Sequence, residues 1–425
     1  SMAKKVELDQ DKLNKLQQIR EAGVEPFPYS FNQTHHAKQL NEKFAKIKPE
    51  EKKNIKVNVA GRVMLRRVMG KASFFHIQDE TGQLQIYLTK DDLGEDQYKL
   101  FAKKTDIGDI IGFCGSIFKT RKGEVTVHAK EAIFLCKSVL QMPEKFHGIK
   151  DIELKYRHRC LDLITNQDSK EIFKKRSAMI KAVRDYFTEK GFIEVETPTL
   201  QTQYGGANAR PFVTHINAWD MPMFLSISPE LFLKRLLVGG FEKVYTICKN
   251  FRNEDVDPTH NPEFTMLEIY QSYVDYEQMM VYLEEVYEKA CIAINGSTKV
   301  KRMYNGEEVE LEFKAPWRRL SMIDSIKEYA GIDVSKMNKE KILHVIKDKR
   351  IMFDGSEKDL SWGIAVQLLF EELVEDKLIQ PMHIIDHPKE TTPLCKAKRG
   401  DNRLIERFES FCLGMELCNA YSELN

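Results

Sequence analysis

The sequence predicts an α+β protein of more than one domain: an N-terminal five-stranded β-barrel, then a domain in which helices flank an antiparallel sheet. Three observations lead to this prediction. The chain has 425 residues, more than one ordinary hydrophobic core holds. Apolar and polar residues alternate in short runs between residues 55 and 127. Beyond residue 170, a long helical pattern gives way to strands and helices in irregular order, which is typical of α+β domains.

Residues 1–54 are expected to form a helical extension. Helix formers fill residues 7–22, and Gly23 offers a stop signal. The apolar positions there are Leu8, Leu13, Leu16 and Ile19, set among lysines. This pattern is typical of a solvated amphipathic helix and equally of a cationic arm that binds a nucleic-acid backbone. Both interpretations stay open.

Residues 55–145 carry five strand patterns separated by turn residues. The strands are expected at residues 57–63, 73–77, 84–88, 109–113 and 125–127. Five short antiparallel strands suit a small closed barrel such as the OB-fold. Because that fold commonly offers one face to single-stranded nucleic acid, a nucleic-acid partner is expected.

A charged connector at residues 146–169 is expected to act as a hinge into a second domain at residues 170–425. That domain begins with a helical pattern to Lys190, and its strands are expected at residues 193–195, 224–227, 243–247 and 265–273. Residues 297–360 are rich in Lys and Ile and predict a helical insertion.

Composition indicates a globular protein without a strong overall charge. Lys and Arg number 65 against 64 Asp and Glu, so any basic face or acidic pocket must be sought locally. No apolar run reaches the length of a membrane span. The eight cysteines form no paired CxxC ligand set, which predicts reduced thiols in a cytoplasmic protein rather than structural zinc. The start, Ser1-Met2-Ala3, looks like a scar of tag removal, and neither a signal peptide nor a transit segment follows it.

The segment from Phe251 to Tyr270 carries the strongest chemical signal. It predicts a strand, a charged loop and a returning strand, on which alternation places four residues on one face: Phe264, Met266, Glu268 and Tyr270. Such a face suits a pocket that holds a flat ring at one end and a cation at the other. Arg252 across the hairpin offers a planar fork for phosphate or carboxylate oxygens. The alternative is a solvated hairpin with surface ion pairs.

Several motifs resemble those of the class II aminoacyl-tRNA synthetases. Phe251 to Glu254, a loop, and His260 to Thr265 are similar to motif 2. Residues 191–198, GFIEVETP, are similar to motif 1, the dimer-interface element. Residues 205–212, GGANARPF, resemble the loop that folds over the amino acid in the lysine, aspartate and asparagine subclass. Together with a barrel like that subclass's anticodon-binding domain, the resemblance covers nearly the whole chain.

The resemblance implies a lysine-binding pocket. The positions that match the subclass are Gly206, Glu230, Arg252, Glu268, Tyr270, Asn419 and Glu423. Lysine needs anionic groups for both of its ammonium groups, whereas aspartate would need cations at its side chain. No Lys or Arg is found among the matched side-chain contacts, which favours lysine. Because three carboxylates without a cation are costly to bury, the ligand itself is expected to complete the charge balance.

The resemblance also implies ATP and Mg²⁺. The matched ATP positions are Arg252, Glu254, His260, Asn261, Phe264 and Glu416. Arg252 is the implied catalytic residue, because attack by the lysine carboxylate builds negative charge on the α-phosphate oxygens. Glu409 and Glu416, seven residues apart and expected on one face, are the implied magnesium ligands. An ordinary exposed acidic pair is the alternative.

In the barrel, the positions that match the anticodon readers are Arg67, Phe74 and Gln85. Phe74 can stack on an unpaired base while Gln85 bonds to the base edge. Taken singly, a phenylalanine at this place is more often a core residue than a base reader, and it is the resemblance that favours Phe74 as the reader. Its neighbour Phe75 points to the opposite face, so only one of the two lies outside.

The implied activity is ATP-dependent activation of lysine and its transfer to tRNA(Lys) by a cytoplasmic homodimer that pairs through motif 1, without a membrane partner. The sequence stops at Asn425, within the segment that leads to motif 3 in the family, and Arg407 does not replace the second ATP-clamping arginine. We expect a longer protein; the alternative is one that lacks this half of the ATP site. Charging of aspartate or asparagine, and a non-catalytic tRNA-binding or regulatory role, remain the rival functions.

Overall fold

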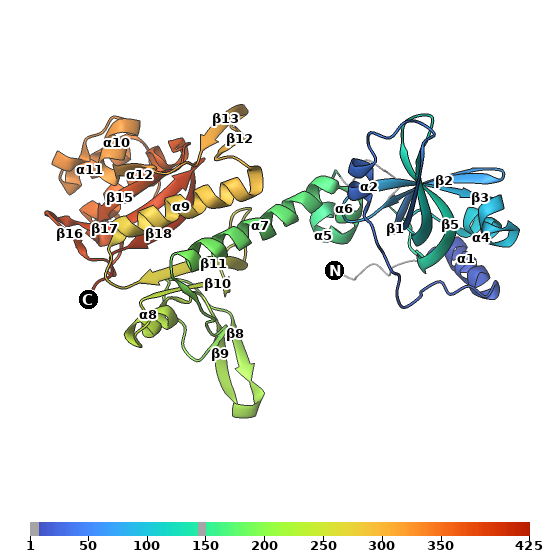
Figure 1. Ribbon diagram of the computed structural model, residues 1–425. Helices are drawn as coiled ribbons and strands as arrows, with labels where there is room; N and C mark the ends of the chain where they lie inside the picture. Colours follow the sequence, from blue (N-terminus) through green and yellow to red (C-terminus); the bar gives the residue numbers. More distant parts are fainter. Residues whose placement is uncertain (1–7, 143–149) are drawn as a thin grey trace. The chain divides into compact units, whose positions relative to one another are not determined.

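The computed structural model describes residues 8–142 and 150–425, which divide between two compact units, Ser1–Ser169 and Lys170–Asn425 (Figure 1). The Ser1-Met2-Ala3 start and the first residues of the expected hinge, 146–149, lie outside the described residues. Across the two described ranges, none of the helices has the length and apolar character that crossing a membrane requires.

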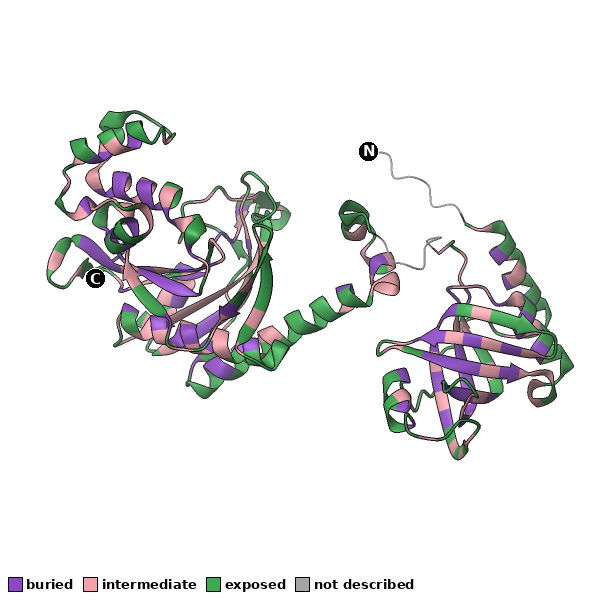
Figure 2. Ribbon diagram, turned by 90° about the horizontal axis from the view of Figure 1, so that it is seen from above, coloured by how far each residue is buried: buried purple, intermediate pink, exposed green. Residues whose placement is uncertain are grey.

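The first unit contains a closed five-stranded sheet in the order β1-β2-β3-β5-β4, with β4 returning to β1. Its strands are β1 (Lys52–Met69), β2 (Ala72–Gln78), β3 (Gln83–Thr89), β4 (Ile110–Lys119) and β5 (Val125–Cys136). Buried positions alternate with more exposed ones along the strands (Figure 2). The inward set, which includes Val57, Phe75, Ile86 and Phe113, forms one core. The predicted OB-like barrel is confirmed.

Two details of the barrel differ from the expectation of short antiparallel strands. β1 has 18 residues: its first part pairs with β4 and its last part with β2, with a register shift between Val63 and Leu65. Such an irregularity bends a strand and lets it serve both neighbours. In addition, β3 and β5 pair in parallel. Local alternation gives no information about which distant strand becomes the neighbour.

Helices cover the barrel of the first unit. They are α1 (Gln10–Glu21), α2 (Ala37–Lys43), α3 (Lys90–Leu93), α4 (Glu95–Lys104), α5 (Ile152–Arg157) and α6 (Arg159–Thr165). α1 begins at Asp9, whose carboxylate accepts hydrogen bonds from the amides of Asp11 and Lys12. Ile19 of α1 is fully buried in the barrel core. The expected helix is present, and its apolar face is packed.

The cations of α1 are bound to the barrel. Lys12 Nζ donates to the backbone oxygen of Leu140 at 2.6 Å, and Lys15 Nζ pairs with Asp106 at 2.7 Å. Asp106 also pairs at 2.7 Å with Lys137, which is fully buried and bonds the equally buried Asp109 at 2.9 Å. Burial raises the pKa of Asp109, although Lys137 opposes the shift. Lys12 and Lys15 are therefore bound to the barrel through polar and ionic contacts.

The second unit begins with the long helix α7 (Gln167–Glu189) and contains several small sheets. One has the order β11-β10-β6 and another β7-β9-β8, and a larger one has the order β14-β15-β17-β16 with β18 beside β17. Most pairs are antiparallel, but β6 with β10 and β14 with β15 are parallel. The strand bounds are β6 (Ile193–Glu194), β7 (Leu200–Gln201), β8 (Val213–Ile216), β9 (Met221–Leu225), β10 (Lys243–Phe251), β11 (Glu263–Gln271), β14 (Arg318–Ser321), β15 (Met382–Pro388), β16 (Ala397–Lys398), β17 (Asp401–Cys412) and β18 (Met415–Tyr421).

Helices pack on these sheets and confirm the α+β class. α9 (Tyr276–Asn295) lies along β17 and β18, where Tyr276 and Met280 contact the fully buried Phe408 (Figure 1). The helices α10 (Met322–Ala330), α11 (Lys339–Asp348) and α12 (Trp362–Leu373) share a second core with β15 and β17. α8 (Glu230–Val238) packs against β10 and β11.

The prediction of a helical insertion at residues 297–360 is wrong for its first part. That part forms the hairpin β12 (Lys299–Tyr304) and β13 (Glu307–Glu312), followed by β14. Asn305 and Gly306, both with positive φ, make the two-residue turn that favours a tight hairpin. Only α10 and α11, further along, supply the expected helices.

Candidate active site

The β10–β11 hairpin presents two different faces, as the alternation of β11 predicted. Thr246 lies opposite Glu268, and Asn250 lies opposite Phe264. On one face Asn250 Nδ2 donates to Met266 Sδ at 3.4 Å. On the other face Leu267 and Ile269 pack with the buried aromatic residues of α7, Tyr186 and Phe187. The apolar face anchors the hairpin, which leaves the polar face for a ligand.

Arg252 stands at the end of β10 with an unused donor. Its guanidinium carbon lies 5.1 Å from the ring centroid of Phe264, and Nη2 donates to the backbone oxygen of Ile227 at 3.3 Å. Nε is buried and has no hydrogen-bond partner among the residues that the structure describes. Because an unsatisfied buried donor is costly, this atom is suited to an anionic ligand such as a phosphate or carboxylate.

Glu268 lies deep on the polar face of the hairpin. Its carboxylate accepts hydrogen bonds from Ser228 Oγ at 3.2 Å and from the Tyr270 hydroxyl at 3.1 Å. Burial raises the pKa of Glu268 to about 7, and the charge of Glu230 adds to the rise. Burial and Glu268 also raise the pKa of Tyr270 far above its ordinary value, so its hydroxyl stays a donor. A cation placed here would restore the ionised carboxylate.

Glu230 and Glu423 converge on a cation that the sequence reasoning missed. Lys234 Nζ lies 2.6 Å from Glu230 Oε1 and 3.0 Å from Glu423 Oε2. The Tyr421 hydroxyl approaches the same Glu230 oxygen at 3.4 Å. Lys234 follows Glu230 by four residues on α8, a spacing that places two side chains on one helix face, so this pair could have been found. Lys234 therefore supplies part of the charge balance that the ligand was expected to complete.

Gly206 forms a wall of this acidic pocket. Its φ of +86° is one that side-chain-bearing residues rarely adopt. A Cβ there would lie 2.9 Å from the Cβ of Glu230 and 3.1 Å from Ser228 Oγ. Only glycine lets the backbone at this position approach Glu230 and Ser228 so closely. Gly206, Glu230, Glu268, Tyr270 and Glu423 are therefore gathered in one region with Arg252, which also acts electrostatically on Glu268.

The loop between β10 and β11 holds three further matched ATP positions, Glu254, His260 and Asn261, all exposed. Glu254 accepts a hydrogen bond from the amide of Arg210 at 3.1 Å, which ties this loop to the one that begins at Gly205. His260 pairs with Asp257 at 2.8 Å, and Asn261 lies exposed next to it. The structure thus brings Arg252 and Phe264 together and places His260 and Asn261 in the open loop.

The two carboxylates matched to magnesium lie on paired strands, Glu409 on β17 and Glu416 on β18, and their side chains interact directly. The turn at Leu413 and Gly414 has positive φ at both residues. The side chain of Glu409 is only 13% exposed, so the interpretation as an exposed acidic pair fails for it. Burial raises its pKa to about 8, with a further rise from Glu416. Two carboxylates that oppose each other's ionisation are suited to a divalent cation.

The residues around Glu409 are polar. His387 Nδ1 lies 3.4 Å from Glu409 Oε1, and Arg407 Nε donates to Asn419 Oδ1 at 2.9 Å. Asn419 is opposite Glu409 in the strand register. Within residues 8–142 and 150–425, no three His, Cys, Asp or Glu side chains are gathered closely enough to hold a metal alone.

The three matched positions in the barrel lie on neighbouring strands. Arg67 is opposite Phe74, and Phe74 is opposite Tyr87, whose ring centroid lies 4.9 Å away. Phe75 is fully buried, which places Phe74 on the outer face. Gln85 is buried, and its amide bonds His76 at 3.0 Å and Thr126 at 3.1 Å. Tyr87 was missed, although the alternation of β3 places it on the face of Gln85.

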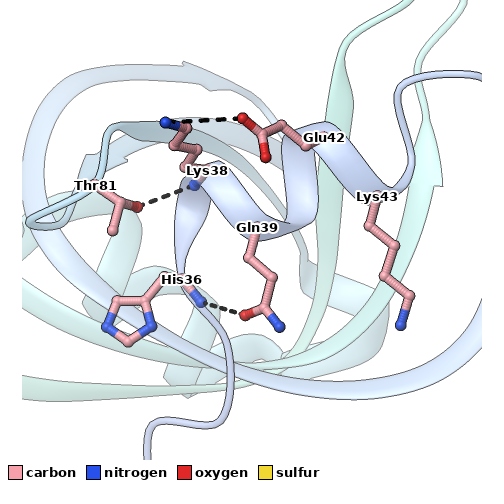
Figure 3. A pocket seen from close by; sticks show the side chains of 6 residues that line it. All are labelled: His36, Lys38, Gln39, Glu42, Lys43 and Thr81. Carbon is pink, nitrogen blue, oxygen red and sulfur yellow. Dashed lines mark hydrogen bonds and ion pairs between the residues drawn. The ribbon is translucent and has the colours of Figure 1, made fainter. Parts of the chain in front are cut away.

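A shallow pocket elsewhere on the barrel unit does not share this chemistry (Figure 3). It is lined by His36, Lys38, Gln39, Glu42, Lys43 and Thr81. The first amides of α2 are already bonded, Ala37 to Asp79 at 2.7 Å and Lys38 to Thr81 at 3.0 Å. Lys38 also approaches Glu42 at 3.9 Å. These groups therefore satisfy one another, and the pocket is not part of the candidate site.

Comparison with known proteins defines the class. Residues 151–425 match the family model described as tRNA synthetases class II (D, K and N), and residues 57–135 match that of the OB-fold nucleic acid binding domain. The chain belongs to the class II tRNA synthetases of the aspartate, lysine and asparagine group.

Three curated relatives are lysine–tRNA ligases. The lysine–tRNA ligase of Clostridium novyi is 48% identical over 98% of this chain and 80% of its own length. That of Pelotomaculum thermopropionicum is 49% identical over 99% of this chain and 81% of its own length. That of Clostridium acetobutylicum is 48% identical over the whole chain and 81% of its own length.

Proposed function

We propose that this chain is a lysine–tRNA ligase. A carboxylate oxygen of lysine attacks the α-phosphorus of ATP, pyrophosphate leaves, and the lysyl group then passes from the adenylate to tRNA(Lys). The observation that carries this proposal is the acidic pocket of Glu230, Glu268 and Glu423 beside Arg252. The names of the relatives support it.

The pocket suits a substrate with a cation at each end. Glu230, against the backbone of Gly206, receives the α-ammonium group. Glu268 and Glu423, with Tyr270, receive the side-chain ammonium group, and Asn419 completes this set from β18. An ammonium ion next to Glu268 lowers the pKa of that carboxyl and gains a charge-assisted hydrogen bond. Aspartate would place a third negative group among these carboxylates, and asparagine would leave them uncompensated.

Arg252 is the catalytic residue of the adenylation step in this proposal. Its unpartnered Nε and planar fork stabilise the negative charge that builds on the α-phosphate oxygens. Phe264 stacks on the adenine, Glu254 accepts from its amine, and His260 and Asn261 contact the phosphates when the loop closes over ATP. Glu409 and Glu416 hold Mg²⁺, which neutralises charge on the phosphates.

We infer that the barrel binds the anticodon. Arg67 and Phe74, adjacent in the strand register, supply a phosphate contact and a stacking platform, and Gln85 reads a base edge. The bonds of Gln85 to His76 and Thr126 fix its amide orientation in the free protein. Recognition through Gln85 therefore requires a base that competes for one of these bonds.

We also propose a homodimer that pairs through motif 1, in the cytoplasm. The first half of α7 is largely exposed (Figure 2), and Ile172 there is 66% exposed. Ile193 and Leu200, on β6 and β7, are 49% and 48% exposed. Exposed apolar side chains on these elements suit an interface between copies. All eight cysteines are free, which suits a reducing compartment.

The test is lysine-dependent ATP–pyrophosphate exchange by the full-length protein. We expect exchange with lysine and none above background with aspartate or asparagine. The Arg252→Ala variant should lose at least a hundredfold in rate while the protein stays folded. Exchange with aspartate or asparagine in place of lysine would refute the proposal. Tight tRNA binding without any adenylate formation would favour the non-catalytic rival.

A further inference from the structure

Lys234 connects two parts of the pocket that are far apart in the chain. Its ammonium group lies within 3.0 Å of Glu230, on the first turn of α8, and of Glu423, in the segment after β18. Burial disfavours the charge of Lys234, but the two carboxylates outweigh burial and raise its pKa. Lys234 is therefore a permanent cation inside the pocket.

The pocket then has a definite charge. At pH 8 its three carboxylates, Glu230, Glu268 and Glu423, are opposed by two cations, Lys234 and Arg252. One negative charge remains. Free lysine, with two ammonium groups and one carboxylate, has a net charge of one positive unit. Bound lysine therefore leaves the site neutral, the condition that a partly buried charge cluster favours.

We propose that Lys234 is a specificity-determining residue that adjusts the pocket to a monocationic amino acid and disfavours dicationic amines. The inference rests on the proposed function. Without Lys234 the pocket would carry two negative charges and would match a diamine such as cadaverine, which has both ammonium groups of lysine but no carboxylate. Lys234 thus selects for the presence of the carboxylate on which adenylation depends, in addition to the contact of that carboxylate with Arg252.

A purely structural role for Lys234 makes a different prediction. If the side chain only holds Glu423 in place, its loss weakens the binding of lysine and cadaverine to the same extent, because both use the same ammonium contacts. A charge-selecting role changes the ratio of the two affinities. The ratio is therefore the quantity to measure.

The experiment is calorimetric titration at pH 8 of the full-length protein with lysine and, separately, with cadaverine. We compare the unaltered protein with Lys234→Met, Lys234→Gln and Lys234→Arg. Lys181→Met, a substitution of a lysine that is 76% exposed on α7, is the matched control. The preference for lysine over cadaverine should fall at least tenfold in the Met and Gln variants, and should stay within twofold in Lys234→Arg and Lys181→Met.

An unchanged preference in both neutral variants, with thermal unfolding showing that they are folded, would overturn the proposal and leave the proposed function intact. If the unaltered protein neither binds lysine nor supports lysine-dependent exchange, both fail. Two neutral variants are included so that misfolding of one does not decide the result.

Discussion

The Tyr270 hydroxyl lies 3.1 Å from Oε2 of Glu268, two residues earlier on the same face of β11. It is one of two donors to a carboxylate that burial has moved to a pKa of about 7. A carboxylate with this pKa is half neutral near physiological pH. The binding of a cationic substrate then depends on pH in a range where most carboxylates do not titrate.

Lysine affinity should therefore fall as the pH is lowered from 8 to 6. Glu268 is ionised above about pH 7 and neutral below it, and lysine binds the ionised form. The ionised fraction changes about tenfold over this range, so the dissociation constant should rise by about the same factor. Calorimetry at both pH values measures the change. The Glu268→Gln variant should bind lysine weakly, and its affinity should change much less with pH. If lysine affinity in the unaltered protein did not change with pH, Glu268 would not be the carboxylate that binds the ammonium group.

Glu423→Gln should raise the Michaelis constant for lysine far more than that for ATP. The change removes one of the two carboxylates proposed to bind the side-chain ammonium group of lysine, and it leaves Arg252 and Phe264 unchanged. The loss of a charged hydrogen bond costs about 1.5–3 kcal/mol. A rise of about tenfold or more for lysine is expected in pyrophosphate exchange. Equal effects on the two substrates would show that Glu423 does not contact lysine.

Phe74→Ala should weaken aminoacylation of tRNA and spare adenylate formation. The substitution removes a stacking platform on the outer face of the barrel, worth about 1–3 kcal/mol per base. Pyrophosphate exchange and tRNA charging, measured side by side, separate the two steps. Phe75→Ala is the comparison, since it truncates a fully buried ring and should cost about 3–5 kcal/mol of stability. A loss of stability of that size in Phe74→Ala would mark Phe74 as a core residue.

Lys137→Met should destabilise the barrel by about 3 kcal/mol, because it leaves the buried Asp109 without its cation. Amide hydrogen exchange over residues 110–136 measures the effect locally and should become about a hundredfold faster. The double variant Lys137→Met with Asp109→Asn should recover part of the loss. Lys56→Met, at an exposed position of β1, is the control. Equal amide exchange rates in Lys137→Met and in the control would mean that the Lys137–Asp109 ion pair contributes little to the stability of the barrel.

Ile172→Glu should shift the protein from dimer to monomer in light scattering coupled to gel filtration. A charge at this exposed position of α7 would be buried without a partner in the proposed interface. Met303→Glu, on β12 and also 66% exposed, should leave the dimer intact. A monomer in the unaltered protein would exclude the homodimer.

The sequence predicted the fold well where local periodicity determines it. Alternation correctly placed Phe74 and Phe75 of β2 on opposite faces and Glu268 on the polar face of β11, because side chains of a strand point to opposite sides wherever that strand lies. It could not predict the parallel pairing of β3 with β5, which depends on long-range closure. The hairpin of β12 and β13 was not predicted, although Asn305-Gly306 is a typical sequence for a two-residue hairpin turn. The charged residues around this turn also suit a helix.

The sequence indicated which residues belong to the candidate site, but it indicated less well how these residues are arranged in space. Lys234 was overlooked because its second partner, Glu423, meets it only in the folded chain. The spacing of Glu409 and Glu416 did not reveal the tight turn that places them on paired strands, with a register shift between Ser410 and Phe411. The residue types suggested the chemistry of the site. Only the pairing of distant strands shows which ionisable side chains lie close enough to interact.

The bonds from α1 to the barrel have a practical consequence for how the first unit tolerates cleavage. A protease that cut between residues 22 and 36 would not release the helix, because Ile19 in the core and Lys15 on Asp106 would still hold it. A fragment that starts at Ile55 would leave Asp106 with Lys137 as its only counterion from this network and would uncover apolar surface. Removing α1 from a barrel fragment therefore costs both buried apolar contact and a counterion of Asp106.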